Sequence, residues 1–100
     1  MSSPLERPDI RVVARILEAL WKNNGPMRPT QLQQASGTNY SQFERYLDLL
    51  RERGLVDVSD LEQGALIRLT VRGEQAHSFL VRAVSLLLSG RPRGIDDLST

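Results

Sequence analysis

Residues 30–56, TQLQQASGTNYSQFERYLDLLRERGLV, decide the fold. Thr30 stands at the start of a segment with capping-box spacing, which predicts a short helix that ends near Ser36. Asn39 can cap a second helix over residues 40–53, because a glutamine follows three residues later and Gly54 can terminate it. Two helices joined by so short a connection, with a glycine inside it, are typical of a helix-turn-helix.

The flanking segments predict three further elements. Asp9 can cap a helix that runs to Asn24, before a Gly-Pro pair stops it. Its apolar residues form one stripe, namely Ile10, Val13, Ile16, Leu17, Leu20 and Trp21. Residues 55–59 and 65–69 read as two strands of a hairpin, with residues 60–64 as the turn. The inward positions of this hairpin are Val56, Val58, Ile67 and Leu69.

The last predicted helix, residues 71–89 with Thr70 as its cap, carries more apolar surface than its own domain needs. Its apolar residues spread over about 200°, whereas a helix packed only on its own domain needs a stripe just over about 100° wide. They are Ala76, Phe79, Leu80, Ala83, Val84, Leu86, Leu87 and Leu88. We therefore expect a homodimer, and the predicted interface residues are Leu80, Ala83, Val84, Leu87 and Leu88. In the alternative, the C-terminal tail folds back over this surface, or Leu86 and Leu88 stay exposed.

Composition describes a single small domain. The chain has 100 residues, 13 Lys and Arg against 12 Asp and Glu, one His and no Cys. A chain of this size buries only about 65% of its unfolded surface, so a partner subunit would stabilise it. Without cysteine there is no disulfide framework and no thiolate metal site, and one histidine cannot form a ligand cluster. We expect no metal, no cofactor and no zinc finger.

No pattern in the chain predicts catalysis or a membrane partner. His77, on the border of the last apolar face, is expected to be a packing or surface residue, since no Ser or Asp is spaced to form a triad with it. No apolar run approaches the roughly 20 residues that span a bilayer, and the first eight residues lack a hydrophobic signal region. We expect a cytoplasmic protein that is not an enzyme.

The segments 40–56 and 69–73 resemble the archaeal winged-helix family of small DNA-binding regulators and chromatin-associated proteins. The first has the run Tyr-Leu-x-x-Leu-x-x-x-Gly-Leu, and the second has Leu-Thr-x-x-Gly. The resemblance covers residues 9–89. It implies a mainly α fold of the α+β type, a winged helix-turn-helix with a C-terminal dimerisation helix. The expected parts are a disordered N-terminus at 1–8, the winged domain at 9–70, the dimerisation helix at 71–89 and a flexible tail at 90–100.

In that family the third helix enters the major groove of double-stranded DNA, the wing touches the backbone or the minor groove, and the last helix pairs two subunits. The resemblance implies that the groove-facing residues of this chain are Tyr40, Ser41, Gln42 and Arg45. Gln can bond the adenine edge and Arg the guanine edge, which fits this role. Thr30 and Thr38 are predicted phosphate contacts near helix starts, and Arg28 and Arg68 could gather on the same surface.

Charge leaves a second function open. The helix 40–53 has no net charge, because its three acidic residues balance three arginines. The wing, which is the predicted hairpin of residues 55–69, is acidic at Asp57, Asp60 and Glu62. We expect it to have a structural role and not to contact DNA. Polar residues on a helix are often only a solvated face. The alternative is therefore a winged-helix module that binds protein instead of DNA; paired arginines would favour it, and free arginines around the third helix would favour DNA. The sequence shows no pocket motif for an effector ligand.

Overall fold

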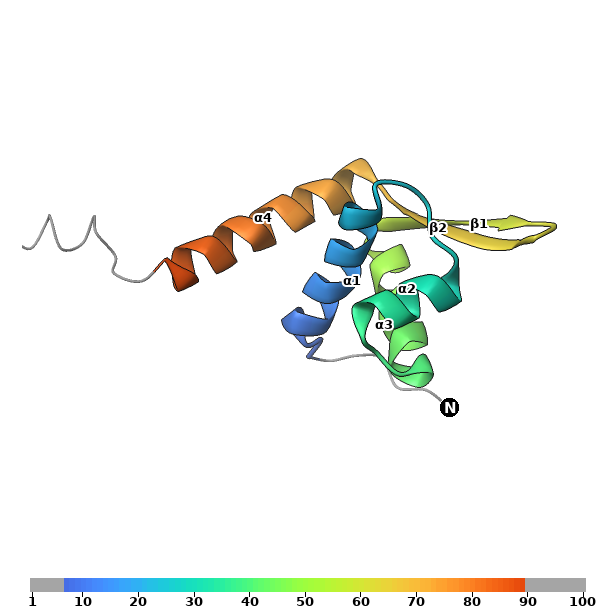
Figure 1. The fold of residues 1–100 in the computed structure, drawn as a ribbon, viewed down its shortest axis with the longest axis horizontal. Helices are drawn as coiled ribbons and strands as arrows, with labels where there is room; N and C mark the ends of the chain where they lie inside the picture. Colours follow the sequence, from blue (N-terminus) through green and yellow to red (C-terminus); the bar gives the residue numbers. More distant parts are fainter. Residues whose placement is uncertain (1–6, 90–100) are drawn as a thin grey trace, which may run out of the picture.

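The computed structural model describes residues 7–89. Three helices come first, then a two-stranded hairpin and a long last helix (Figure 1). The elements are α1 (Ile10–Asn23), α2 (Pro29–Ser36), α3 (Tyr40–Glu52), β1 (Val56–Leu61), β2 (Gly64–Leu69) and α4 (Val71–Leu88). This order is the one that the sequence predicts. The predictions for residues 1–6 and 90–100 lie outside the described residues.

Short polar side chains start three of the helices, as predicted. The Asp9 carboxylate accepts a hydrogen bond from the backbone N–H of Arg11 at the start of α1. Asn39 Oδ1 accepts one from Gln42 N–H, 2.7 Å away, at the start of α3. Thr70 Oγ1 accepts one from Gly73 N–H, 2.9 Å away, at the start of α4. Each bond satisfies one of the backbone donors that a helix leaves free in its first turn.

The start of α2 differs from the prediction. The helix begins at Pro29 with Arg28 as its N-cap, so Thr30 lies inside the first turn and does not cap it. Proline suits the first helical position because its φ is already helical and its missing N–H would have no partner there. The Gln31 side chain accepts a hydrogen bond from the Arg28 backbone N–H at 3.4 Å, which is half of a capping box that begins two residues earlier than expected.

The hairpin is longer than predicted and has a third backbone partner. The antiparallel register runs from Val56 opposite Leu69 to Leu61 opposite Gly64, so the turn is shorter than the five residues expected. On the far side of β2, Met27 and Ile67 exchange two backbone hydrogen bonds of 2.9 and 2.8 Å. These bonds fix the base of the wing to the segment between α1 and α2.

The core lies between the first three helices and the base of the wing. Its buried apolar residues are Val12, Val13, Ile16, Leu17, Leu20, Met27, Leu32, Phe43, Tyr46, Leu50, Val56 and Ile67. The predicted stripe of α1 is wrong at its two edges, since Ile10 is 59% exposed and Trp21 is 51% exposed. Val12 is buried instead. The face of α1 that packs against the rest of the protein is rotated slightly from the centre of the predicted apolar stripe.

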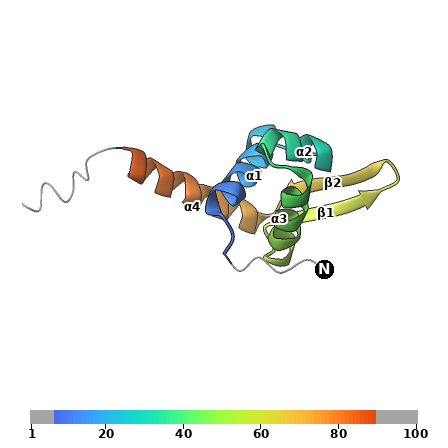
Figure 2. The same cartoon turned by 90° about the horizontal axis from the view of Figure 1, so that it is seen from below.

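The helix α4 leaves the body after its first half. Its residues Gly73, Ala76, His77 and Leu80 are buried or half-buried against the body, and every residue from Val81 onward is exposed. Figures 1 and 2 show this half projecting from one end of the molecule, opposite the wing. The chain therefore carries an apolar helix segment that its own described residues do not cover.

Candidate nucleic-acid interface

The first turns of α3 present the polar surface that the sequence predicts. Tyr40 is 64% exposed, and Ser41 and Arg45 are exposed as well. Gln42 is half-buried. The opposite face of the same helix is held in the core by its buried residues Phe43, Tyr46 and Leu50. The structure thus brings the four predicted residues together at the start of one fixed helix.

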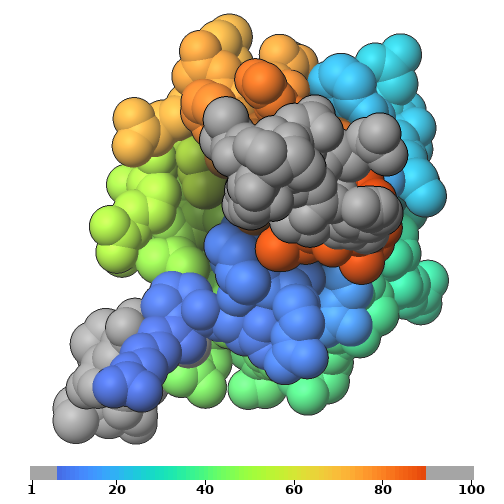
Figure 3. Space-filling view, turned by 90° about the vertical axis from the view of Figure 1, so that its left-hand side faces the viewer, coloured from blue at the N-terminus to red at the C-terminus, as the bar shows by residue number. Residues whose placement is uncertain are grey.

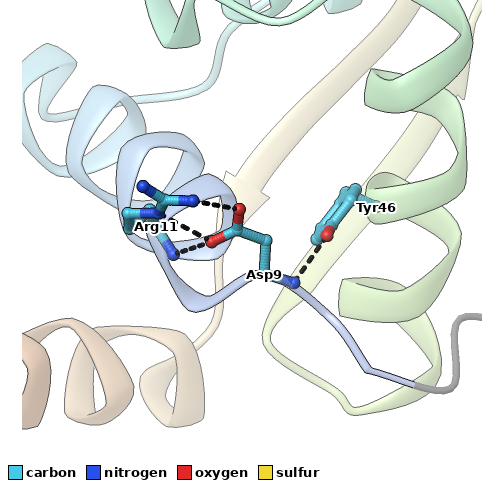
Figure 4. Close-up of polar contacts among 3 residues, drawn as sticks. All are labelled: Asp9, Arg11 and Tyr46. Carbon is cyan, nitrogen blue, oxygen red and sulfur yellow. Dashed lines mark hydrogen bonds and ion pairs between the residues drawn. The ribbon is translucent and has the colours of Figure 1, made fainter.

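A hydrogen bond from α1 also fixes α3 in place. The backbone N–H of Asp9 donates to the hydroxyl of Tyr46, 2.7 Å away (Figure 4). The Asp9 carboxylate is in turn held by the guanidinium of Arg11, and these hydrogen bonds lower the pKa of Asp9. The start of α1 is thereby tied to the middle of α3. Sequence reasoning missed this contact, since the two residues lie 37 positions apart.

The connection between α2 and α3 is tight because its polar groups bond to one another. Gly37 has a φ of 69°, a conformation that glycine adopts without strain. The hydroxyls of Ser36 and Thr38 are 3.1 Å apart, and the side-chain amide of Gln33 donates to the Thr38 carbonyl. Thr38 is only 6% exposed. Its predicted role as a phosphate contact is not retained, because its hydroxyl lies inside the turn.

Tyr40 carries an internal hydrogen bond on the exposed surface. Its hydroxyl donates to the carboxylate of Glu44 at 2.6 Å, one helical turn further on. This bond and the negative charge of Glu44 raise the pKa of Tyr40. The phenol therefore stays protonated at neutral pH, and its ring remains open to solvent.

The three other predicted contacts lie on neighbouring elements. Thr30 is exposed in the first turn of α2. Arg28 is exposed too, and its Nη1 donates to the backbone carbonyl of Gln63 at the tip of the wing, 2.8 Å away. Arg68 is an exposed residue of β2, opposite Asp57 in the register. Arg28 thus has a structural task that the sequence does not reveal, since it joins α2 to the wing.

The arginines around α3 are free of carboxylates. Among residues 7–89, Arg11 is the one arginine that forms an ion pair, with Asp9 at 3.0 Å. Arg45, Arg28 and Arg68 form none within that part of the chain. An exposed guanidinium without a carboxylate partner keeps its donors available for an external anion such as a phosphate.

The comparison with protein families agrees with this architecture. The sequence model of the family described as winged helix-turn-helix matches residues 6–86, which is most of the chain. The chain belongs to the winged helix-turn-helix family. A search of curated protein sequences found no match.

Several solved structures share the winged-helix fold. Sso10a-2, described as a DNA-binding protein from Sulfolobus solfataricus, is 17% identical with a TM-score of 0.72, and the match covers 92% of this chain and 96% of that one. F93 from STIV, described as a winged-helix DNA-binding protein, is 13% identical with a TM-score of 0.78 and coverage of 85% and 99%. The PcaV transcriptional regulator from Streptomyces coelicolor is 20% identical with a TM-score of 0.67 and coverage of 87% and 68%.

This winged helix has an acidic wing. Asp57, Asp60 and Glu62 are all exposed, and the described hairpin shows no ion pair for any of them. An acidic hairpin repels phosphates. The first turns of α2 and α3 contain no acidic residue, and the nearest carboxylate on α3 is that of Glu44, which accepts a hydrogen bond from Tyr40. The start of α3 is therefore a more favourable surface for phosphates than the wing.

A half-buried polar contact of the winged helix lies elsewhere, between α1 and α4. His77 is 6% exposed, its Nε2 is 2.7 Å from Glu18 Oε1, and its ring stacks on Trp21 with the ring centroids 5.0 Å apart. The hydrogen bond with His77 lowers the pKa of Glu18. The prediction that His77 is a packing or surface residue is confirmed. No sequence signal pointed to Glu18, which lies 59 positions away.

Residues 7–89 contain neither a cluster of metal-ligating side chains nor a helix that could span a membrane. Within residues 7–89 no group of three or more His, Cys, Asp or Glu side chains is placed to hold a metal ion. No helix in this part of the chain has both the length and the apolar character needed to cross a membrane.

Proposed function

We propose that this protein binds double-stranded DNA and regulates transcription, with the start of α3 in the major groove. The observation that carries the proposal is the exposed Arg45, which has no carboxylate partner and stands beside Ser41 and Gln42 on a helix that the core holds rigidly. Two similar structures are described as DNA-binding proteins and a third as a transcriptional regulator, which supports the same function.

The polar residues of α3 have the chemistry for reading base edges. The guanidinium of Arg45 can bond the O6 and N7 atoms of guanine, and the amide of Gln42 can bond the N6 and N7 atoms of adenine. Ser41 can donate or accept, and Tyr40 adds an exposed ring. Around this helix, Thr30, Arg28 and Arg68 are proposed to contact phosphates, which would fix the register of the protein without reading the sequence.

We also propose that the protein binds as a homodimer. The exposed second half of α4 supports this, and the proposed interface keeps the residues Leu80, Ala83, Val84, Leu87 and Leu88. Two copies related by a two-fold axis would present two α3 helices to half-sites about one turn of DNA apart.

The Arg45→Ala variant tests the proposed contact. A duplex enriched from a random library by the unmodified protein is titrated with both proteins, followed by fluorescence anisotropy. We expect the substitution to weaken binding by about 1 to 3 kcal/mol and to relax the preference for one base pair. The matched control is Arg82→Ala, which removes the same charge from the polar side of α4 and should bind like the unmodified protein. Unchanged affinity and unchanged base preference for Arg45→Ala would refute the assignment.

The acidic wing favours a second candidate function. With Asp57, Asp60 and Glu62 exposed, this hairpin has the charge to meet a basic surface of another protein. In that case the chain is an interaction module, and the duplex titration gives no binding at low salt.

A further inference from the structure

A groove runs along the outer side of α1, between α1 and α4. Its volume is about 650 Å³, which is the volume of a bulky set of side chains or of a small ligand. Residues of α1 form its floor, residues of α4 form one wall, and Met27 and Ala35 also line it. Its lining is mainly apolar, with Ala14, Ala19, Leu80, Val81 and Val84 among its residues. Figure 3 shows the orange-red surface of α4 beside the blue surface of α1.

The same chain carries an apolar ridge that contacts none of this groove. Leu86, Leu87 and Leu88, in the last turn of α4, are 76%, 79% and 79% exposed. Leu80, Val84 and Leu87 follow one another at intervals of four and three residues, so one face of the helix runs from the wall of the groove to its free end. An isolated helix end with these side chains in water is marginal, and it gains stability only when another surface covers it.

We propose that the groove of one copy receives the Leu86–Leu88 end of α4 from a second copy. The inference rests on the homodimer proposed above. It adds a second contact surface to that dimer, because the groove beside α1 binds the end of α4 from the other copy. Under a two-fold axis both contacts form at once, because each copy offers one groove and one helix end. The two α4 helices then run antiparallel, with the end of each beside the α1 of the other.

The charges at the rim of the groove fit a helix C-terminus. The last turn of α4 contains no basic residue, so no cationic side chain within this turn offsets the partial negative charge of its terminal carbonyls. Arg15 and Lys22 lie at the rim of the groove, where a docked helix end would meet them. The other titratable groups that face the groove are Glu18 and His77, which are bonded to each other at 2.7 Å, and Lys22 lies 3.6 Å from Glu18. The rim is therefore cationic overall, which favours a helix C-terminus.

Disulfide trapping tests this arrangement, because the chain has no cysteine of its own. The test protein is the full chain with both Ala14→Cys, in the floor of the groove, and Leu88→Cys, at the helix end. After mild oxidation we expect a covalent dimer on a non-reducing gel, which disappears on reduction. The two single variants should give little dimer, because antiparallel helices hold equivalent residues far apart. The matched control carries Glu62→Cys with Leu88→Cys, which pairs the helix end with the exposed wing and should not crosslink.

Three other outcomes would overturn the proposal in distinguishable ways. If light scattering shows a monomer before oxidation, both the homodimer and the docking site are refuted. A dimer that gives no crosslink from Ala14→Cys removes only the docking site. Loss of free thiols in a protein that stays monomeric means that the chain's own C-terminal part covers the groove. None of these measurements uses DNA, so they leave the proposed DNA binding to its own test.

A second variant checks the same contact without oxidation. Ala14 is only half-buried and faces the groove, so Ala14→Glu adds a negative charge where the proposed helix end lies and leaves the core intact. We expect the dimer dissociation constant to rise at least about tenfold, while the thermal unfolding of the monomer stays cooperative. An unchanged dissociation constant would contradict the docking site.

Discussion

At the scale of single residues, the motif Leu-Thr-x-x-Gly at residues 69–73 has a structural explanation. Thr70 Oγ1 donates to the Gly54 carbonyl at 2.6 Å and accepts from Gly73 N–H. A side chain on Gly73 would overlap the carbonyl oxygen of Leu55, so the backbone of α4 lies directly against the start of the wing. The motif therefore joins the start of the wing to α4.

The Gly73→Ala variant tests this explanation. We expect it to lower the free energy of unfolding by about 1 to 3 kcal/mol, because the added methyl group meets backbone that cannot move aside. Urea denaturation measures the change. Gly25→Ala is the matched control, since a methyl group there meets nothing closer than 3.9 Å, and it should change stability far less. Equal stabilities for the two variants would show that α4 does not approach the wing as described.

Residue roles that depend on neighbours a few positions away in the sequence could be predicted, whereas roles that depend on residues far away in the sequence could not. Asp9, Asn39 and Thr70 cap helices as expected, because a cap bonds to a group two or three residues away. Thr38 has the same chemistry, but tertiary packing buries it. At the candidate interface, the exposure of Arg45 follows from helical periodicity, whereas its lack of a carboxylate partner depends on where every acidic residue lies.

At the scale of elements, cap residues and stop signals, together with hydrophobic periodicity, predict the four helices to within two residues at each end. The hairpin was less predictable, since its strands extend further and its base pairs with Met27 through backbone groups that carry no sequence signature. The element on which the proposed function depends is α3. Its first turn is held by the Asn39 cap, and this turn contains the residues proposed to enter the groove.

The Asn39→Ala variant should destabilise the protein by about 0.5 to 2 kcal/mol, because the first turn of α3 loses its side-chain acceptor. The change is read from the denaturation midpoint. Asn39→Asp keeps an acceptor oxygen at the same place and serves as the control that should retain most of the stability. If alanine and aspartate behave alike, the cap contributes nothing and the description of this helix start is wrong.

At the scale of the whole molecule, the projecting half of α4 is the least self-sufficient part of the fold. The sequence predicted surplus apolar surface on this helix, and the structure agrees, since none of its residues beyond Leu80 is buried. How two copies would meet in the proposed dimer could not be predicted, because periodicity shows that a helix has two apolar sides without showing which neighbour covers each. The groove beside α1 could not be predicted from the sequence either, because it arises from the angle between α1 and α4.

The Leu87→Glu variant tests the need for a partner. Leu87 is 79% exposed in the single chain, so a charge there leaves the core undisturbed, yet it would be buried in the proposed dimer. Light scattering should show the mass of one chain for this variant and of two for the unmodified protein. Leu61→Glu adds the same charge to the exposed wing and should remain dimeric. A dimeric Leu87→Glu protein would rule out this face of α4 as the interface.

The most direct test of the central claim, that this winged helix binds DNA, is a salt series. The unmodified protein is titrated into a labelled random duplex and followed by fluorescence anisotropy at several salt concentrations. We predict that affinity falls by about tenfold or more between roughly 50 and 200 mM salt, because even two phosphate contacts release counterions to that extent. Absence of binding at the lowest salt concentration, or an affinity that does not change with salt, would contradict the account.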